Sequence, residues 1–222
     1  MPPRELSPQL VLASQSPRRT ELLALTGLTF AQEYAQIDES CRDGESPMLH
    51  ARRLAREKAS AVVQLQNDDC LVLAADTIVV HNNAILGKPA NTEDADRMLR
   101  DLQGETHTVI TAIALARAGS CNSRDDCCST EVQLRQFSRR ERSDYIASGD
   151  PLDKAGAYGI QNRQFRPAST LGGCLANVIG LPLCHVVRTL STAGMRLTVD
   201  IASACAEHTG YDCPVYQNIL AR

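Results

Sequence analysis

The sequence contains no tryptophan and only three phenylalanines, and aromatic residues make up 4% of its 222 residues. It has no apolar run near the roughly 18 residues that a membrane-spanning helix needs. Its first residues, Met1–Ser7, lack the charged-then-apolar layout of a signal peptide. We therefore expect neither a membrane protein nor a secreted one.

The sequence also lacks an excess of charge of one sign, because its formal net charge is −3 and its pI is about 6.0. Domains that hold nucleic acid by bulk electrostatics usually have a pI above about 9. This absence argues against a nucleic-acid partner and favours small-molecule chemistry. With 43% hydrophobic residues, the chain can bury a core of ordinary size, and its length fits one main α/β domain.

Cysteine is plentiful, but the nine cysteines form no Cys-x-x-Cys pair. Their number is odd and their spacing irregular, which favours reduced thiols in a cytoplasmic protein over a disulfide framework. Cys205, His208 and Cys213 offer only three ligands at a spacing that is atypical for zinc, and we attribute this spacing to chance.

The apolar patterning predicts strands that alternate with helices. The strands are expected at Gln9–Ala13, Leu28–Tyr34, Leu71–Ala75 with Ile78–Val80, His107–Ala116 and Glu131–Phe137, and the helices at residues 18–25, 46–66, 92–102, 138–148 and 181–193. Gly119–Ser129 is polar and without periodicity, so we interpret it as a loop or hairpin tip. The predicted fold is α/β, a mixed twisted sheet flanked by helices with a central cleft.

The first candidate site is the segment Ser14–Arg19, where a buried strand turns into a helix. The helix N-terminus favours an anion, Ser14 can donate to a phosphate oxygen, and Arg18 and Arg19 can bind such oxygens bidentately. On this segment alone, a simple N-cap at Ser16 with two solvated arginines has the stronger support.

The second candidate site is Asp76-Thr77, at the end of an apolar strand where α/β folds place their clefts. A carboxylate inside such a run must be capped, paired or bound to a metal. Structural and functional explanations of Asp76 are equally supported at this point. Lys88, on a turn, and Glu39, after another predicted strand, could join Asp76, although each is weak evidence by itself.

Taken together, these segments resemble the Maf family of nucleoside triphosphate pyrophosphatases in order and spacing, from about Leu10 to Leu190. The segments that carry the resemblance are Leu12–Arg19, Asp38-Glu39, Ala55–Ala59, Ala75–Thr77, Leu86–Pro89, Met98–Gly104 with His107, Lys154–Gln161 and Val178–Pro182. The resemblance implies an architecture like that of Maf proteins and inosine triphosphatases. It places the pyrophosphatase domain at residues 1–190 and leaves 191–222 as a C-terminal extension, for which a short packing helix is the simplest expectation.

The resemblance further implies hydrolysis of a nucleoside triphosphate to the monophosphate and pyrophosphate, by water attack assisted by Mg²⁺ or Mn²⁺. Asp76 matches the family's proton acceptor, and Asp76 and Glu39 are the expected metal ligands. Asp76, Glu39 and Lys88 are the three residues expected to be catalytic. Ser14, Arg18, Arg19 and Lys58 are expected to bind the triphosphate. A homodimer is also implied.

Within the family, the sequence resembles the subgroup that acts on dTTP and UTP. Arg18, Thr77 and Gln161 match the positions that set base specificity in that subgroup. A glutamine offers one acceptor and two donors, which suits the mixed carbonyl and N–H edge of a pyrimidine. In the subgroup of the family that is associated with 7-methyl-GTP, an acidic residue stands at the position of Gln161.

Besides the C-terminal extension, the chain departs from the family pattern at two places. Residues 162–170 replace a glycine-containing turn and an apolar strand, which puts the geometry behind Gln161 in question. Cys174 stands where a hydroxyl is usual. We interpret the remaining thiols and His107 and His185 as structural, with Cys70 and Cys184 in the core and Cys127-Cys128 on a mobile loop.

Two other functions compete with hydrolysis. A kinase or nucleotidyltransferase would also bind a triphosphate, but the sequence has neither G-x-x-x-x-G-K-[ST] nor G-x-G-x-x-G. A non-catalytic nucleotide-binding regulator of cell division could use the same pocket. The set of Glu39, Asp76 and Lys88 argues against it, because a pure binder gains little from a buried carboxylate that faces phosphates.

Overall fold

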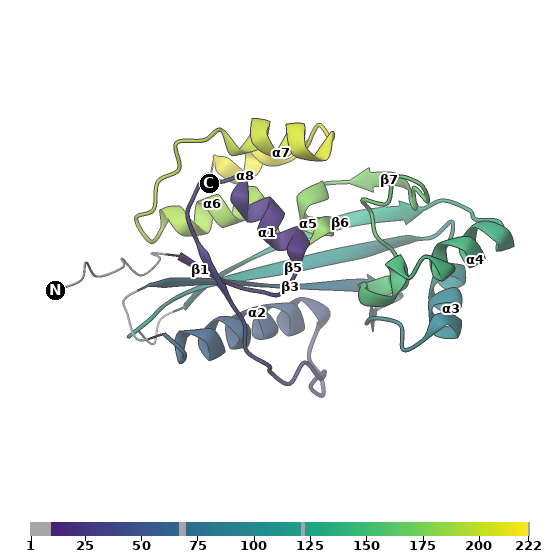
Figure 1. Ribbon diagram of the computed structural model, residues 1–222, viewed down its shortest axis with the longest axis horizontal. Coiled ribbons are helices and arrows are strands. Elements are labelled where there is room, and N and C mark those ends of the chain that lie inside the picture. Colours follow the sequence, from purple (N-terminus) through teal and green to yellow (C-terminus); the bar gives the residue numbers. More distant parts are fainter. Residues whose placement is uncertain (1–9, 67–69, 121–122, 222) are drawn as a thin grey trace.

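A seven-stranded mixed sheet runs through the middle of the molecule (Figure 1). The computed structural model describes residues 10–66, 70–120 and 123–221. The strand order is β2-β1-β3-β5-β6-β7, and β4 pairs with β3 outside this path. The strands are β1 Leu10–Ala13, β2 Ala31–Glu33, β3 Leu71–His81, β4 Ala84–Leu86, β5 Thr106–Arg117, β6 Ser123–Leu134 and β7 Ala168–Gly172.

Helices cover both faces of this sheet, as the sequence predicts. They are α1 Pro17–Ala24, α2 Pro47–Val63, α3 Thr92–Leu102, α4 Arg139–Ala147, α5 Leu175–Ile179, α6 Leu183–Ser191, α7 Ile201–Thr209 and α8 Tyr216–Leu220, with short 3-10 turns at Asp150–Asp153 and Ala155–Ala157. In Figure 1, α2 lies on one face, α1 and α5–α8 lie on the other, and α3 and α4 lie beyond one end of the long strands. The expected mixed sheet flanked by helices is confirmed.

Three apolar clusters hold these layers together. Alternate residues of the central strands supply one cluster beneath α2 and a second beneath α1, α5 and α6. A third cluster lies between α3, α4, the first part of β5 and the last part of β6. The α2 side is built largely from alanines such as Ala51, Ala55 and Ala59, which let the helix approach the sheet closely. Leucines, which are larger than alanines, fill the opposite side, and Leu10 and Leu12 are among them.

The central cleft follows from the way β3 is paired. Strand β1 pairs with the first part of β3, ending at Ala13↔Ala74, and β4 pairs with its last part, beginning at Val79↔Leu86. Between these two partners, residues Ala75–Ile78 have β5 on one side only, among the strands that the structure describes. The sheet is therefore open along this edge, and the side chains of Asp76 and Thr77 reach the opening.

The prediction of a loop or hairpin tip at Gly119–Ser129 holds for Gly119, which lies in the turn after β5, but is wrong from Ser123 onward; residues 121–122 lie outside the described residues. Strand β6 begins at Ser123 and pairs with β5 throughout, so Cys127 and Cys128 lie in the sheet and Cys128 is buried. The strand lacks apolar alternation because its acidic residues are paired with helices on the two faces. Asp125 forms ion pairs with Arg52 and Arg56 of α2. Asp126 pairs with Arg188 of α6, at 2.6 Å between Nη2 and Oδ2.

Helix termini differ from the prediction in small but informative ways. Ser138 forms the capping box at the start of α4, whereas α3 is capped by Asn91 rather than by Thr92. At α1 the expected N-cap Ser16 has the right backbone geometry, but its side chain makes no capping hydrogen bond. The hydroxyl of Ser16 is therefore available to another partner.

The residues after Leu190 contain two helices rather than one. Helices α7 and α8 pack on α6, and Ile201, in α7, is buried in the same cluster as the core leucines. This packing extends the main core through the extension. None of the helices in the described ranges combines the length and the apolar character that crossing a membrane requires.

His107 lies inside the third cluster and gives the stability of the fold a pH dependence. Its Nε2 is 2.7 Å from the hydroxyl of Tyr158, while its Nδ1 is buried without a partner in the described part of the chain. Burial, with a smaller contribution from His81, lowers the pKa of His107 to about 4. The folded protein therefore favours the neutral ring, and protonation favours the unfolded chain.

We expect this histidine to stabilise the fold fully above about pH 6.5 and to lose that contribution as the pH falls towards 4. The loss should be on the order of 3 kcal/mol in the free energy of unfolding. Urea unfolding between pH 7.5 and 4 checks this, with His107→Gln as the variant. A pH profile of equal slope in the variant and the wild type would assign the acid sensitivity to other groups.

Candidate functional site

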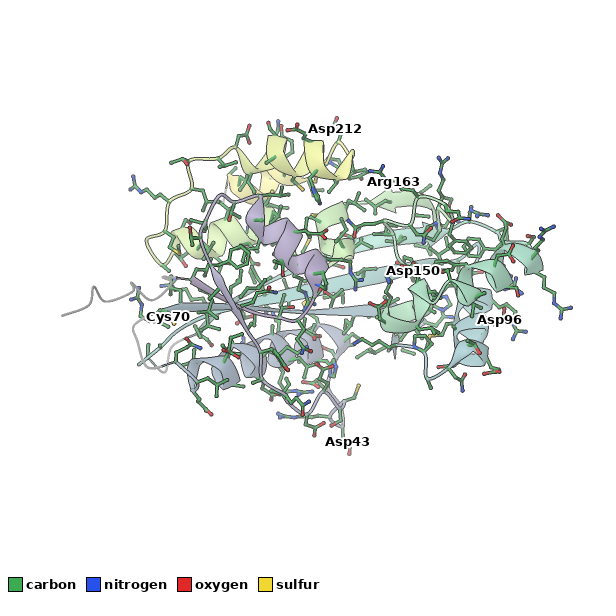
Figure 2. The ribbon with its side chains drawn as sticks, in the orientation of Figure 1. Asp43, Cys70, Asp96, Asp150, Arg163 and Asp212 are labelled. Atoms are coloured by element: carbon green, nitrogen blue, oxygen red, sulfur yellow. The ribbon has the colours of Figure 1, made fainter. Side chains whose placement is uncertain are left out.

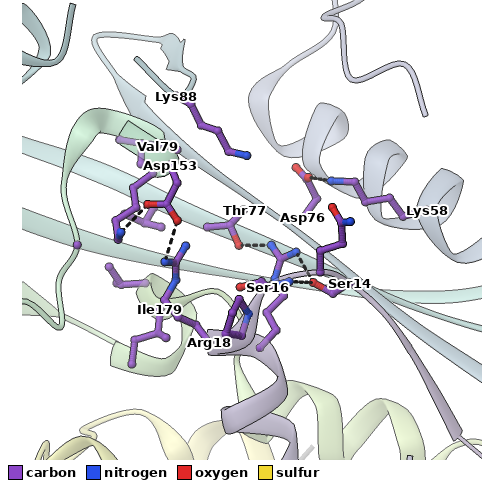
Figure 3. Close-up of a pocket in the computed structure, with 18 of the residues that line it drawn as sticks. Ser14, Ser16, Arg18, Lys58, Asp76, Thr77, Val79, Lys88, Asp153 and Ile179 are labelled. Carbon is purple, nitrogen blue, oxygen red and sulfur yellow. Dashed lines mark hydrogen bonds and ion pairs between the residues drawn. The ribbon is translucent and has the colours of Figure 1, made fainter. Parts of the chain in front are cut away.

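A cavity of about 830 Å³ lies along the open edge of β3 (Figure 3). Its walls come from the turn between β1 and α1, the segment after β2, α2, β3, the turn after β4 and the segment 150–162. All nine residues that the sequence singles out line this cavity, namely Ser14, Arg18, Arg19, Glu39, Lys58, Asp76, Thr77, Lys88 and Gln161. The fold thus brings together side chains that are up to about 150 positions apart in the chain.

Asp76 and Lys58 form the centre of the charged end of the cavity. Asp76 is 5% exposed, and its Oδ1 accepts a hydrogen bond of 2.6 Å from the Lys58 Nζ. The same ammonium group is 2.7 Å from Oε1 of the more exposed Glu39. Desolvation is the largest single influence on Glu39 and works against its charged form. The hydrogen bond from Lys58, together with the charges of Lys58, Lys88 and Arg19, outweighs desolvation and keeps the pKa of Glu39 below the usual value. One lysine therefore holds two carboxylates in place.

The second oxygen of Asp76 is the chemically available one. Its Oδ2 is buried and has no hydrogen-bond partner among the described residues. A buried, unpaired carboxylate oxygen is costly unless a ligand, a water or a cation satisfies it. In Figure 3 the Asp76 carboxylate lies between Lys58 and Lys88 and faces the open cavity.

The donor set at this end suits a divalent cation. Mg²⁺ is typically held by one or two carboxylates, with waters and substrate phosphates completing its octahedron. The free Oδ2 of Asp76 and the exposed carboxylate of Glu39, which meet at Lys58, fit this description. Within the described ranges, no group of three or more acidic, histidine or cysteine side chains could hold a metal ion.

Ser14 presents a hydroxyl donor at the turn before α1. Its Oγ accepts from the backbone N–H of Ser16 at 3.1 Å and from Nη1 of Arg19 at 3.5 Å. Both interactions use the lone pairs of Ser14, so its proton remains free to be donated into the cavity. Together with the positive end of α1, this arrangement is suited to an anionic oxygen.

Arg19 lines the cavity, but its hydrogen bonds go to other parts of the protein. Its guanidinium group donates to the carbonyl oxygen of Gly180 at 2.9 Å and to Oγ1 of Thr77 at 3.0 Å. Burial lowers its pKa, and the charge of Asp76 opposes that shift. Arg19 therefore joins the β1–α1 turn, β3 and the end of α5. It lines the cavity, but its guanidinium group is largely occupied by protein partners.

Arg18 and Lys88 have side-chain donors that the described part of the protein leaves largely unused. Among the described residues, Arg18 makes one long ion pair, 3.6 Å from Nη1 to Oδ2 of Asp153. Lys88 is exposed on the turn after β4 and has no hydrogen-bond or ion-pair partner within the described residues. These two side chains can move onto a ligand at little cost.

Sequence reasoning missed the acidic and basic residues of the segment 150–154. Lys154 donates to the backbone oxygen of Asp150 and to Oδ1 of Asp153, both at 2.6 Å, and Asp150 accepts from the hydroxyl of Tyr145 at 2.6 Å. Asp150, labelled in Figure 2, lines the cavity together with Asp153 and Lys154. Lys154 is the first residue of a segment that carries the family resemblance. It is surrounded by turn residues, and no periodic pattern in the sequence distinguishes it from a solvated lysine.

Gln161 lies at the far wall of the cavity, and the unusual segment behind it is well anchored. Phe165 is buried and stacks on the ring of Tyr145, with 3.9 Å between centroids and an angle of 10°. The Nη2 of Arg135 donates to the carbonyl oxygen of Phe165 at 2.7 Å. Asn162, next to Gln161, donates to Asp150 at 3.1 Å. Aromatic packing and hydrogen bonds therefore hold the segment behind Gln161 in place.

The backbone of Cys174 is held by Thr130. Its N–H donates to Oγ1 of Thr130, and its carbonyl oxygen accepts from the same hydroxyl, both at 3.2 Å. The thiol is buried against Cys128 and Cys213. The contact with Cys128 and the burial raise its pKa to about 12, although the contact with Cys213 opposes this shift. The thiol therefore packs beneath the C-terminal helices and does not line the cavity.

An open mixed sheet with a cationic cavity around one buried carboxylate defines a class, the α/β proteins whose site suits a polyphosphate ligand. The Maf-like protein family model matches residues 9–193. A dTTP/UTP pyrophosphatase of Salmonella typhimurium is 48% identical over 182 residues, which is 82% of this chain and 91% of the relative. That of Hahella chejuensis is 43% identical over 194 residues, covering 86% and 96%. The chain belongs to the Maf-like protein family.

Among solved structures, the chain is similar to a HAM1 protein from Coxiella burnetii. The TM-score is 0.45 at 18% sequence identity, and the match covers 83% of this chain and 96% of that one. A Ham1 protein of Staphylococcus aureus also has a TM-score of 0.45, at 11% identity.

Proposed function

We propose that this protein is a nucleoside triphosphate pyrophosphatase that hydrolyses dTTP and UTP to the monophosphate and pyrophosphate. The observation that carries the proposal is the buried Oδ2 of Asp76, which has no partner among the described residues, in a cavity lined by five cationic side chains. Curated relatives with 40–48% identity carry the name dTTP/UTP pyrophosphatase. Membership in their family and the chemistry of the site support the same reaction.

The residues divide the reaction between them. Asp76 accepts the proton of the attacking water through Oδ2, while Lys58 holds its other oxygen in place. Lys88 and Arg18, which have few protein partners, neutralise charge that develops on the phosphates and on the leaving pyrophosphate. Ser14 donates to a phosphate oxygen at the N-terminus of α1. Water attack at the α-phosphorus then breaks the bond to the bridging oxygen, and pyrophosphate leaves.

We also propose that Glu39 and Asp76 hold a Mg²⁺ or Mn²⁺ ion together with the substrate. When bound, such an ion supplies charge neutralisation at the phosphate oxygens. The cytoplasmic location and the homodimer expected from the sequence remain predictions. Size-exclusion chromatography with light scattering tests the second of them.

A panel of nucleotides tests the proposed function directly. Pyrophosphate release is measured with dTTP, UTP, CTP, dATP, GTP and 7-methyl-GTP, each with Mg²⁺ or Mn²⁺. We expect turnover of dTTP and UTP and little turnover of the others. If the folded protein binds these nucleotides and turns over none of them, the non-catalytic regulator is the correct alternative.

Gln161 gives a separate test of base recognition. Gln161→Glu replaces two N–H donors by a carboxylate, which repels the carbonyl oxygens of uracil and thymine. We expect kcat/KM for UTP to fall by about tenfold or more, with the melting temperature nearly unchanged because the side chain is exposed. Gln164→Glu, an exposed neighbour outside the cavity lining, is the matched control. An unchanged base preference would exclude Gln161 from recognition.

A further inference from the structure

Asp76 and Thr77 divide the cavity into two ends. As neighbours in β3, their side chains point to opposite faces of the sheet. Figure 3 shows Asp76 directed towards Lys58, whereas Thr77 accepts a hydrogen bond from Arg19. Val79 lies two residues after Thr77 and therefore shares its face. With Val109, Val178 and Ile179, it supplies the apolar part of the cavity wall. The end near Asp76 suits phosphates, and the end near Thr77 suits a base.

The hydroxyl of Thr111 donates its one proton to a hydrogen bond with the backbone of Asn177. Thr111 is fully buried and lies directly opposite Thr77 in the antiparallel pair of β3 and β5. Its Oγ1 donates to the backbone carbonyl oxygen of Asn177 at 2.8 Å, and its N–H donates to the side-chain oxygen of Asn177 at 3.0 Å. The amide of Asn177 donates in turn to Val109 and Thr130 at 2.9 Å each, which fixes its orientation.

This donation determines the direction of the next hydrogen bond. The Oγ1 atoms of Thr77 and Thr111 are 2.9 Å apart, and either could be the donor on geometry alone. Because a carbonyl oxygen cannot donate, Thr111 must give its proton to Asn177 and can only accept from Thr77. The hydroxyl of Thr77 therefore donates its hydrogen bond to Oγ1 of Thr111.

The remaining capacity of Thr77 is one lone pair. Its other lone pair accepts the hydrogen bond from Nη2 of Arg19, at 3.0 Å. A hydroxyl has one proton and two lone pairs, so Thr77 has no proton left for a ligand. Towards the cavity, Thr77 is an acceptor and not a donor.

We infer that Thr111 is a positioning residue that holds Thr77 as an acceptor and thereby selects bases with a ring N–H. This inference rests on the proposed function. Uracil and thymine carry a proton on N3, whereas cytosine has a lone pair there, so the hydroxyl oxygen attracts the first two and repels the third. The exposed Gln161 amide can turn either its oxygen or its nitrogen to the base, so it cannot make this distinction alone.

The ratio of kcat/KM for UTP to that for CTP tests the inference, measured with both nucleotides competing in one reaction. The ratio does not depend on the fraction of active enzyme, so partial misfolding of a variant does not disturb it. Thr111→Val removes the acceptor and frees the proton of Thr77, which can then serve cytosine. We expect the ratio to fall by about tenfold. Thr111→Ser keeps the hydroxyl and should restore the wild-type ratio.

The outcomes separate the two proposals. Wild-type protein that prefers UTP, together with a lower ratio in Thr111→Val and a restored one in Thr111→Ser, supports the inference. A ratio that Thr111→Val leaves unchanged, or a wild type that uses UTP and CTP equally, overturns it while the hydrolysis itself stands. If the wild type releases pyrophosphate from no nucleotide, the proposed function fails, and the inference falls with it.

Discussion

Asp76→Asn should lower pyrophosphate release from dTTP and UTP by a factor on the order of 10³. The amide keeps the size of the side chain and can still accept from Lys58, but it cannot take a proton from water. Steady-state kinetics with a pyrophosphate-coupled assay measures the loss. Circular dichroism and the melting temperature establish that the variant is folded.

Asp101→Asn is the matched control for this variant. Asp101 is an exposed carboxylate on α3, and its ion pair with Arg97 is long, at 3.4 Å. We expect its kinetics to equal those of the wild type. Undiminished hydrolysis by Asp76→Asn would remove Asp76 from the mechanism and leave its free oxygen unexplained.

Arg19→Met should lower kcat/KM for both dTTP and UTP by about 10²-fold, although we do not assign Arg19 to the reacting phosphates. Its guanidinium group joins three segments through Ser14, Thr77 and Gly180. Without these bonds, the turn before α1 and the end of α5 lose their alignment with β3, and small displacements in a site of this kind are costly.

The effect of Arg19→Met should differ from that of a lost phosphate contact. We expect kcat to fall together with a lower melting temperature, whereas Arg18→Met should chiefly raise KM and leave the melting temperature near that of the wild type. Arg196→Met, at an exposed arginine of the C-terminal extension, is the control for the substitution itself. A normal melting temperature with a raised KM in Arg19→Met would restore Arg19 to direct phosphate binding.

The fold was predictable where one physical signal dominated. The apolar stripe at 46–66 predicted α2, observed at Pro47–Val63, and the buried runs on either side of Asp76-Thr77 proved to be one continuous strand. The polarity of β6 concealed it, because Asp125 and Asp126 pair with arginines of α2 and α6 that are distant in sequence. Such pairing is a tertiary property and leaves no local pattern.

The site was predictable as a set of residues but not in its internal roles. The resemblance identified residues that converge on one cavity, whereas the hydrogen bonds that distinguish Arg19 from Arg18 appear only in three dimensions. Thr111 and Asn177 gave no signal, because a threonine in a β-strand and an asparagine in a short helix are individually ordinary. Their significance comes from the direction of their hydrogen bonds.

Identification of the products of UTP hydrolysis tests the central claim most directly. Phosphorus NMR of a reaction with UTP and Mg²⁺ distinguishes cleavage between the α- and β-phosphates from cleavage between the β- and γ-phosphates. We predict UMP and pyrophosphate in equal amounts, formed by the wild type and not by Asp76→Asn. Formation of UDP and inorganic phosphate, or of no product by protein that binds UTP, would contradict the proposed function.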